Sequence, residues 1–353
     1  MTRQAFALAG AVVSASLATA AGAGADAGRV LQDLLAGPLA FTQKQVAAVR
    51  RGDVVVVDLP APVSRQIGVA GAVRIAAPAA RTVALVRDIE RLERGKGFLA
   101  TRKLSDPPVE ADFATFDLPA DDVAALRKCR PGDCDVKLGL SALREVQAMD
   151  WRAPDAVARA RAMMRRRAAA YVKSYRHGGN AELAVYRDAE RPTFIARELE
   201  AMVNDTAGLT TAFPDVSRYL LEYPRGRPQG VEDFYYWSLG EFGLKPVFRI
   251  NHVVIHDVGG ASGLLHVITT KQLYASHYFH TALEVRALVD DAAAPGRGHY
   301  LLVLNLARSD GMTGLFGGIV RSRARRGARD ALRTVLTTMK RRAEALDPSR
   351  AAQ

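Results

Sequence analysis

The last third of the chain constrains the fold most strongly, because it combines strand-like segments with one long amphipathic helix. Residues 234–307 contain several aromatic-rich segments in which apolar and polar side chains alternate, as on the two faces of a sheet. Beyond them, apolar residues recur every three or four positions from Phe316 to Met339, which predicts a helix with one apolar stripe. We therefore expect an α+β fold in which a curved antiparallel sheet grips a long C-terminal helix over residues 316–346.

The alternation in these strands separates an apolar inner side from a polar outer side. Seven polar residues mark the side that we expect to face solvent: Arg249, Asn251, Gln272, Ser276, His280, Glu284 and Arg286. Other polar residues fall on the inner side, where they would orient a bound molecule. With their aromatic and apolar neighbours they form the predicted ligand-binding set: Tyr235, Trp237, His252, His277, Phe279, Thr281, Asn305, Phe316 and Val320.

The first residues carry the features of a bacterial signal peptide. Residues 1–3 are positively charged, and residues 5–20 form an apolar run too short for a stable membrane anchor. Small residues follow as far as Ala25, as a cleavage site requires. We expect a signal peptide over residues 1–25 and an N-terminal leader over residues 26–50, with the mature protein in the periplasm or secreted. The alternative is an Ala-rich helix of the mature protein.

The two cysteines flank a turn. Cys129 and Cys134 enclose Pro131 and Gly132, and this Pro-Gly pair favours a turn that brings the two thiols together. In an oxidising compartment we expect a disulfide, which would fix only the local loop because so short a loop removes little chain entropy. Free thiols, or a metal or redox site, are the alternatives, and a zinc site would need further ligands at suitable spacing.

The formal net charge is +12, and much of the positive charge gathers in two helical segments. A basic excess can serve nucleic acid, an anionic membrane or solubility alone. Export argues against nucleic acid, and the sequence contains neither a zinc-finger spacing nor a Gly-rich phosphate loop. The membrane hypothesis is that at least one helix docks on anionic lipid headgroups, and the alternative is that these arginines are solvated or locally paired. The candidate docking residues are Arg165, Arg166, Arg167, Arg323, Arg325 and Arg326.

Segments upstream of the strands complete one domain over residues 51–346. Residues 67–76 alternate as a strand does, and Pro78 opens a helix that ends before two glycines. Residues 98–104 are strand-like again. Residues 119–228 are mostly helical in pattern, and we interpret them as an insertion that carries the cysteine loop.

The strand over residues 67–76, the helix after Pro78, the strands of residues 234–307 and the long last helix together resemble the START-like helix-grip superfamily. Its members wrap an antiparallel sheet around a C-terminal helix and hold lipids, sterols or other apolar ligands between the two. The resemblance implies an apolar partner, and we assign no cofactor. The helical insertion departs from the usual compact pattern, and residues 347–353 form a tail.

Histidines are the main sign of catalysis in this sequence. Five of them fall in the strand region, where three or four could converge on zinc: His252, His256, His266, His277 and His280. The simpler interpretation is that they are hydrogen-bonded residues of an aromatic-rich sheet, and we assign no metal. Ser276 and His277 are adjacent in a predicted strand and so point to opposite faces, which argues against a nucleophile–base pair.

We therefore predict an exported protein that binds a hydrophobic or amphipathic small molecule between the sheet and the C-terminal helix, with a lipid as the first candidate. An enzyme that acts on an apolar substrate in the same cavity is one alternative. A structural or interaction module without ligand is the other.

Overall fold

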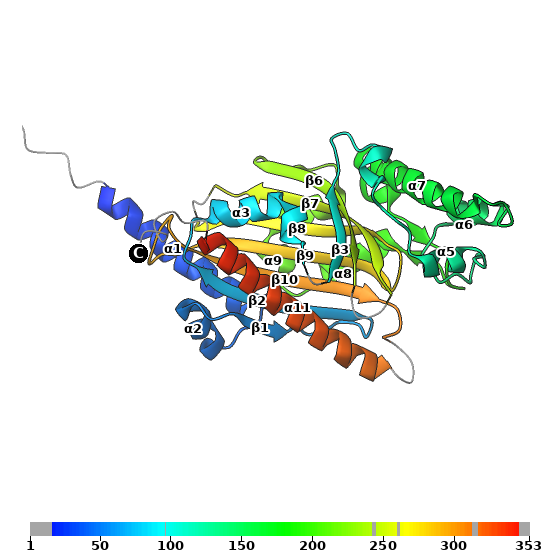
Figure 1. Cartoon of the computed structure of the whole chain (residues 1–353). Helices are drawn as coiled ribbons and strands as arrows, with labels where there is room; N and C mark the ends of the chain where they lie inside the picture. The colour runs from blue at the N-terminus through cyan, green and yellow to red at the C-terminus, as the bar shows by residue number, and fades with distance from the viewer. Residues whose placement is uncertain (1–15, 96, 242–244, 260–261, 313–316, 346–353) are drawn as a thin grey trace, which may run out of the picture.

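The computed structural model describes residues 16–95, 97–241, 245–259, 262–312 and 317–345, and a large antiparallel sheet forms its centre (Figure 1). Eight strands pair in the order β1-β2-β10-β9-β8-β7-β6-β3. Their bounds are β1 (Val55–Asp58), β2 (Gln66–Ile75), β3 (Phe98–Lys103), β6 (Val231–Gly240), β7 (Val247–Asp257), β8 (Leu264–Ala275), β9 (Phe279–Asp290) and β10 (His299–Ser309). A separate short ribbon pairs β4 (Val185–Tyr186) with β5 (Thr193–Phe194).

Helices lie on both faces of this sheet. Their bounds are α1 (Ser16–Ala36), α2 (Gln43–Arg51), α3 (Ala79–Arg87), α4 (Ile89–Leu92), α5 (Ala120–Leu126), α6 (Leu140–Gln147), α7 (Ala156–Gly178), α8 (Ile195–Asp205), α9 (Leu209–Ala212), α10 (Pro214–Glu222) and α11 (Gly317–Ala345). Two turns of 3₁₀-helix span Glu110–Phe113 and Gly179–Glu182. The predicted class, α+β with a large antiparallel sheet and a C-terminal helix, is confirmed.

The second half of α11 packs on the sheet, whereas its first half runs past the sheet margin (Figure 1). Leu332, Leu336 and Met339 are buried and belong to the apolar cluster on this face. Gly71 of β2 lies directly beneath them, since a Cβ at this position would approach Leu336 Cδ1 to 2.6 Å. The close crossing of helix and strand therefore requires glycine here.

The opposite face of the sheet carries the inserted helices. Met164 of α7 and Phe248 of β7 belong to one large apolar cluster on this side. Residues 26–50, which we expected to form a leader, contribute to the same cluster. Leu35 of α1 and Val49 of α2 are completely buried there. The N-terminal helices are therefore part of the folded core in this structure.

Residues 272–287 alternate throughout as a single strand would, but they form a hairpin. β8 ends at Ala275 and β9 begins at Phe279, with Tyr278 between them at φ +56°. Turns that need positive φ usually contain glycine or asparagine, and this one contains neither, so no residue type in it indicates a turn.

The seven polar residues that we expected to face solvent are largely enclosed. Asn251, Gln272 and Arg286 are only 2%, 3% and 6% exposed, Ser276 and His280 are buried as well, and Arg249 and Glu284 are half-buried. The alternation along β7 was correct, since Arg249 and Asn251 share the face opposite to Phe248. The expectation that this face of the sheet is exposed to solvent was wrong, because helices lie on both faces of the sheet.

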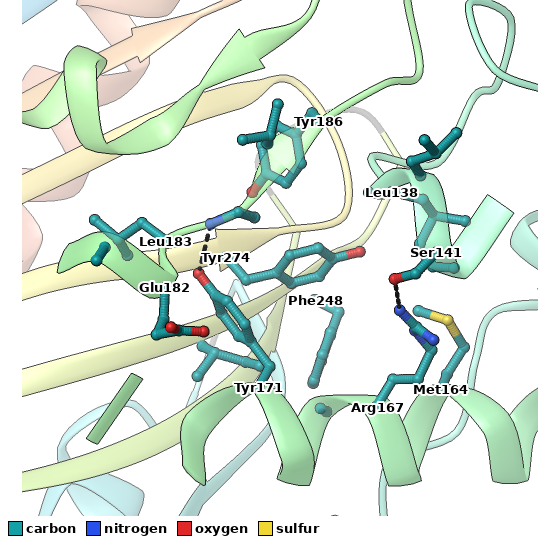
Figure 2. A pocket seen from close by; sticks show the side chains of 18 residues that line it. Leu138, Ser141, Met164, Arg167, Tyr171, Glu182, Leu183, Tyr186, Phe248 and Tyr274 are labelled. Atoms are coloured by element: carbon teal, nitrogen blue, oxygen red, sulfur yellow. Dashed lines mark hydrogen bonds between the residues drawn. The ribbon is translucent and has the colours of Figure 1, made fainter. Parts of the chain in front are cut away.

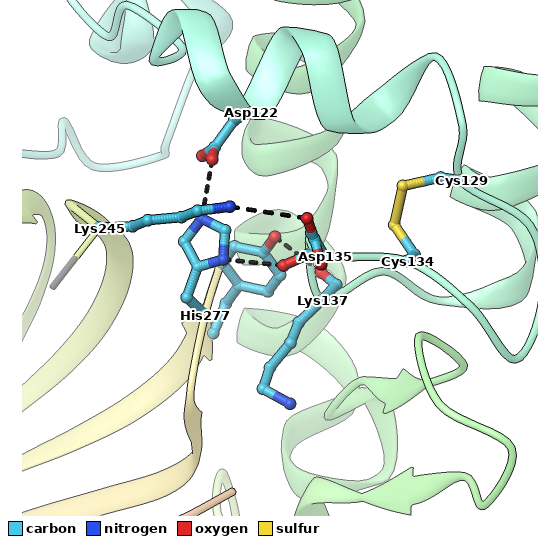
Figure 3. Close-up of a disulfide and its surroundings, with 8 residues drawn as sticks. Asp122, Cys129, Cys134, Asp135, Lys137, Lys245 and His277 are labelled. Carbon is cyan, nitrogen blue, oxygen red and sulfur yellow. Dashed lines mark hydrogen bonds and ion pairs between the residues drawn. A yellow bond between two sulfur atoms is a disulfide. The ribbon is translucent and has the colours of Figure 1, made fainter. Parts of the chain in front are cut away.

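The disulfide between Cys129 and Cys134 is confirmed (Figure 3). Gly132 in the intervening turn has φ +87°, a conformation that glycine adopts without strain. Its N–H donates to the carbonyl of Arg187 at 2.8 Å, and the Cys134 N–H donates to that of Asp188 at 2.9 Å. The loop is thus held both by the covalent bond and by the segment after β4, and a disulfide fits an exported protein.

The expected signal peptide lies mostly outside the described part of the chain. Residues 1–15 are not described, and residues 16–25 form the start of α1. Cleavage within this segment stays a prediction. Among the helices that the structure describes, we find none with the combined length and apolar character needed to cross a bilayer.

Candidate functional site

A cavity of about 460 Å³ lies between the sheet and the inserted helices (Figure 2). Its walls come from α6, α7, the turn after α7, β4, and the strands β7 and β8. The cavity is on the face opposite to α11, so the insertion builds it. A volume in this range is typical of pockets that enclose small organic ligands.

α7 supplies one wall of the cavity with a single helical face. Met164, Ala168 and Tyr171 follow one another at steps of four and three, which places them above one another on the helix. Phe248 and Tyr274 rise from the sheet on the other side. Figure 2 shows the rings of Tyr171, Phe248 and Tyr274 gathered around the same space. The small side chain of Ala168 leaves room between them.

The tyrosine hydroxyls at this cavity are already hydrogen-bonded to the backbone. Tyr171 donates to the carbonyl of Leu273 at 2.7 Å, and Tyr274 donates to that of Lys137 at 2.8 Å. The hydroxyl of Tyr186 accepts a backbone N–H at 3.1 Å. Burial raises the pKa of all three phenols, so they stay neutral at physiological pH. They are therefore uncharged wall groups and are unsuited to act as bases.

Charged groups stand only at the edge of the cavity. Arg167 donates to the hydroxyl of Ser141 at 2.6 Å and to the carboxylate of Glu145 at 2.8 Å, and its side chain is 32% exposed. Glu182 lies at the same rim and is exposed. The cavity thus combines an apolar interior with a charged mouth.

Tyr235 and His252, two predicted ligand residues, lie in the core on the same sheet face but outside the cavity. Their rings stack with centroids 4.7 Å apart. His252 Nδ1 lies 3.2 Å from the hydroxyl of Tyr175, and the hydroxyl of Tyr235 bonds to that of Tyr223. These contacts make them part of a buried aromatic cluster.

Trp237, Thr281 and Phe279 are also placed on or beside the sheet. Trp237 is completely buried and donates its indole N–H to the carbonyl of Asp112 at 2.9 Å. Thr281 is completely buried in β9, and Phe279 is half-buried at the start of that strand. Trp237 touches the cavity only indirectly, through its ring contact with Phe248.

His277 joins the sheet to the disulfide region instead of facing the cavity (Figure 3). Its Nε2 lies 2.9 Å from the carboxylate of Asp122, and its Nδ1 lies 2.8 Å from the carbonyl of Asp135. The ring is 3% exposed. Both ring nitrogens face oxygen atoms, and the ring links the turn between β8 and β9 to α5 and to the residue after Cys134.

The remaining predicted ligand residues lie on the other side of the molecule. Asn305 is half-buried on the sheet face that carries α11, and Val320 is 40% exposed on α11 itself. Phe316 lies outside the described residues. None of the predicted ligand residues that the structure describes lines the cavity. Their ligand-binding role stays a prediction.

Sequence reasoning missed a buried lysine beside the aromatic cluster. Lys271 is 1% exposed and stands directly opposite His252 in the sheet. Its ammonium donates to Asn180 Oδ1 at 2.9 Å and lies over the rings of Tyr175 and Tyr223, at 4.9 and 5.2 Å from their centroids. Burial lowers the pKa of Lys271 to about 7 and is the main cause that lowers the pKa of His252 to about 4. A lysine within an apolar strand is the sequence feature that could have revealed this buried charge.

The two arginine clusters proposed for membrane docking differ in their surroundings. On α7, Arg165 donates to the carbonyl of Phe116 at 2.8 Å, and Arg166 and Arg167 both bind Glu145. On α11 the other three arginines lie along the half of the helix that runs past the sheet: Arg323, Arg325 and Arg326. Of these, Arg323 and Arg326 are exposed and Arg325 is half-buried. The first cluster is locally paired, whereas the second is open to a partner.

Within the described residues, no group of three or more His, Cys, Asp and Glu side chains is arranged to hold a metal ion. Comparison with known protein families gave no family model that matches this chain. A search of curated proteins likewise gave no relative with a significant match.

Proposed function

We propose that this protein is an exported binding protein for an apolar or amphipathic small molecule, which it holds between β7, β8 and α7. The observation that carries the proposal is the cavity of about 460 Å³ with aromatic and aliphatic walls. Its polar wall groups are neutral and already hydrogen-bonded, so burial of an apolar ligand leaves none of them unpaired. Removal of apolar ligand surface from water then supplies the binding free energy.

The charged rim favours an amphipathic ligand with its polar end at the mouth. Arg167 and Ser141 form one side of the rim, and Glu182 stands on another. A ligand carboxylate or phosphate at the mouth would meet Arg167, which remains partly exposed. The apolar remainder would lie between Tyr171, Tyr274 and the other rings. A lipid or fatty acid has this division of character.

We also propose that the fold is a divergent helix-grip fold. β2 is followed by α3, α4 and β3, and α11 follows β10. β2 pairs with β10, and α11 packs back across β2, which supports the likeness. In this proposal the insertion between β3 and β6 creates a ligand cavity on the face away from α11.

An enzyme that acts in this cavity is the less favoured function. The cavity wall contains no buried carboxylate, histidine or lysine among the residues that line it. The Ser141 hydroxyl accepts from Arg167 and has no base beside it in the cavity wall. The apolar walls and the neutral, hydrogen-bonded polar groups of the cavity suit binding.

Filling the cavity will abolish ligand retention. In Ala168→Trp the indole would occupy the space between Tyr171 and the sheet, because Ala168 is 7% exposed and lines the cavity. Protein secreted from its own host would be extracted with solvent, and the extract and the native protein examined by mass spectrometry. We expect a bound apolar molecule in the wild type and at least tenfold less of it in the variant.

Ala170→Trp provides the matched control, since Ala170 is on the exposed side of the same helix. This variant should retain the ligand fully. Equal retention by a folded Ala168→Trp protein would exclude this cavity as the site, and a wild-type protein without any bound small molecule would refute the proposed function.

The first half of α11 will bind anionic membranes. Ile319 and Val320 are exposed by 58% and 40% at its N-terminal end, where the helix dipole is positive. Exposed apolar side chains such as Ile319 and Val320, next to exposed arginines, suit a bilayer surface with anionic headgroups. Changing Arg323 and Arg326 to Gln should weaken sedimentation with anionic vesicles roughly 30-fold, at about 1 kcal/mol for each charge.

The double change Arg165→Gln with Arg166→Gln removes the same charge from α7 and should leave vesicle binding nearly intact. Binding of the wild type should fall as salt rises, because screening weakens exposed electrostatic attraction. Equal binding to neutral vesicles, or the same loss from both double variants, would count against a specific docking role for α11.

A further inference from the structure

The sheet face that carries α3 and α11 is divided into an apolar half and a polar half. Val253 and Ile268 belong to the apolar cluster that packs on these helices. Further along the same strands and on the same face, Asn251 of β7 stands directly opposite Gln272 of β8. Arg286 of β9 lies on this face too, opposite Ile268. Neighbouring strands thus place three polar side chains on one face, with Arg286 level with Ile268, four residues along β8 from Gln272.

Three of these side chains are buried without full hydrogen bonding. Asn251, Gln272 and Arg286 are 2%, 3% and 6% exposed. Five of their polar atoms have no hydrogen-bond partner within the described part of the chain: Asn251 Nδ2, Gln272 Nε2 and Oε1, and Arg286 Nε and Nη1. Folded proteins contain few such atoms, because each has lost its hydration without a replacement. Their position on adjoining strands indicates a shared partner.

The unmet atoms are mostly donors. Four of the five are N–H groups, and two of these belong to a guanidinium. Arg286 uses its remaining nitrogen, Nη2, to pair with Glu284 Oε1 at 2.5 Å. Two amides and a guanidinium on adjoining strands offer donors that match the oxygen atoms of a carboxylate or phosphate, which accept several charge-assisted hydrogen bonds at once.

Two acids lie near this group, and both are paired. Glu284 is the partner of Arg286. Glu93 accepts from the hydroxyl of Tyr236 at 2.9 Å and from that of Thr101 at 3.0 Å, and Arg249 lies 3.9 Å away. Burial is the first cause that raises the pKa of Glu93. Its carboxylate therefore opposes a nearby anion less than an exposed glutamate would.

The side chains between the amide pair and Arg286 are more accessible. Thr270, Glu284 and Asn305 face one another across β8, β9 and β10 and are all half-buried. A ligand would approach the unmet donors past these three residues.

We propose that this polar half-face is a binding site for a small molecule bearing a carboxylate or phosphate group. Its oxygens accept from Asn251, Gln272 and Arg286. The site is on the opposite side of the sheet from the apolar cavity and does not depend on it. Asn305, which the sequence marked as a ligand contact, stands at its rim.

Thermal unfolding of the full chain tests this site with inorganic phosphate, succinate and neutral succinamide. Potassium chloride at equal ionic strength provides the baseline. A dissociation constant of about 0.1 mM would raise the midpoint by roughly 4 °C at about 10 mM probe. We expect that shift from phosphate or succinate and none from succinamide. Phosphate and succinate in separate arms decide which oxyanion fits.

Gln272→Leu should keep or raise the midpoint of the ligand-free protein, because it removes two unmet polar groups, and should abolish the anion shift. Arg286→Lys keeps the charge but loses the fork of donors, and should weaken anion binding about tenfold. If Gln272→Leu does not fold, the anion response of Arg286→Lys tests the site instead. Ala168→Trp, in the other cavity, and the exposed Arg297→Gln should both respond as the wild type does.

The absence of any anion-specific shift in the wild type would overturn the proposal. So would a shift that survives both Gln272→Leu and Arg286→Lys, since it would come from surface charge elsewhere. A lower ligand-free midpoint of Gln272→Leu together with an intact anion response would assign Gln272 to packing alone and equally overturn it.

Discussion

Replacing Lys271 by methionine will remove a contribution to stability that grows between pH 7 and pH 10. Lys271 is fully enclosed, and burial lowers its pKa from 10.5 to about 7. Within that window the unfolded chain holds a proton on this lysine and the folded chain does not. This contribution to the free energy of unfolding therefore rises with pH, by at most about 1.4 kcal/mol per pH unit.

From pH 7.5 to 9.5 we expect the wild type to gain about 2 kcal/mol relative to Lys271→Met. Tyrosines act in the opposite direction, because burial raises the pKa of nine of them, among them Tyr175, Tyr223 and Tyr235, so they stay neutral in the fold while they ionise in the unfolded chain. The stability of the wild type should therefore peak near about pH 9, and that of Lys271→Met should fall as pH rises toward 10.

Urea unfolding at a series of pH values measures this directly. Lys173→Met is the matched control, since Lys173 is an exposed lysine on α7. It should show the same pH dependence as the wild type. A wild-type curve that runs parallel to that of Lys271→Met between pH 7.5 and 9.5 would mean that Lys271 stays protonated in its aromatic surroundings, with its charge stabilised by Tyr175 and Tyr223.

The elements with strong local signals could be predicted from the sequence. Pro78 does precede a helix, and α11 takes in every described residue of the predicted last helix. The alternation of side chains also separated the two faces of β7 correctly. These features depend on neighbours in sequence, where propensity and periodicity act.

The site could not be predicted, because it depends on contacts between distant segments. The cavity joins Tyr171 of the insertion to Phe248 and Tyr274 of the sheet. Each of the three reads in sequence as an ordinary core residue. The sequence also suggested that the cavity would face the C-terminal helix, since nothing in the pattern states which face of the sheet the insertion covers.

The same limit explains the polar residues. Alternation reveals that Gln272 and Leu273 point to opposite faces, but not whether the polar face is wet. Polar residues that alternate along a strand normally indicate that this face of the sheet is exposed to solvent. Here they are enclosed, and only the three-dimensional arrangement shows that Asn251, Gln272 and Arg286 are buried on one face with unmet hydrogen bonds.

The ion pairs of Arg308 are the place where we expect a single substitution to cost the most stability. Arg308 is 2% exposed and donates to Gln66 Oε1 at 2.8 Å. Its two other nitrogens pair with Glu198 at 3.3 Å and with Asp205 at 2.9 Å, which fixes α8 to the end of β10. The Glu198 side chain is 12% exposed and that of Asp205 is 42% exposed, so Glu198 is the principal buried counter-charge.

Glu198→Leu will therefore destabilise the fold by about 3 kcal/mol, because it leaves a buried guanidinium with only the more exposed Asp205 as counter-ion. Arg308→Met should cost less, since Glu198 keeps its ion pair with Arg65 at 2.9 Å. The double variant should be more stable than Glu198→Leu alone, because no buried charge remains unpaired. Urea unfolding of the four proteins gives the coupling between the two sites.

Glu200→Leu is the matched control, since Glu200 is exposed on the same helix, and it should change stability by no more than about 0.5 kcal/mol. The order of stability among these variants distinguishes an effect of the buried charge from an effect of packing. If Arg308→Met were as damaging as Glu198→Leu and the double variant worse than either, packing around the arginine stem would matter more than its charge. α8 would then be held on the sheet by its apolar residues Leu199 and Met202, which are buried whichever partner the arginine has.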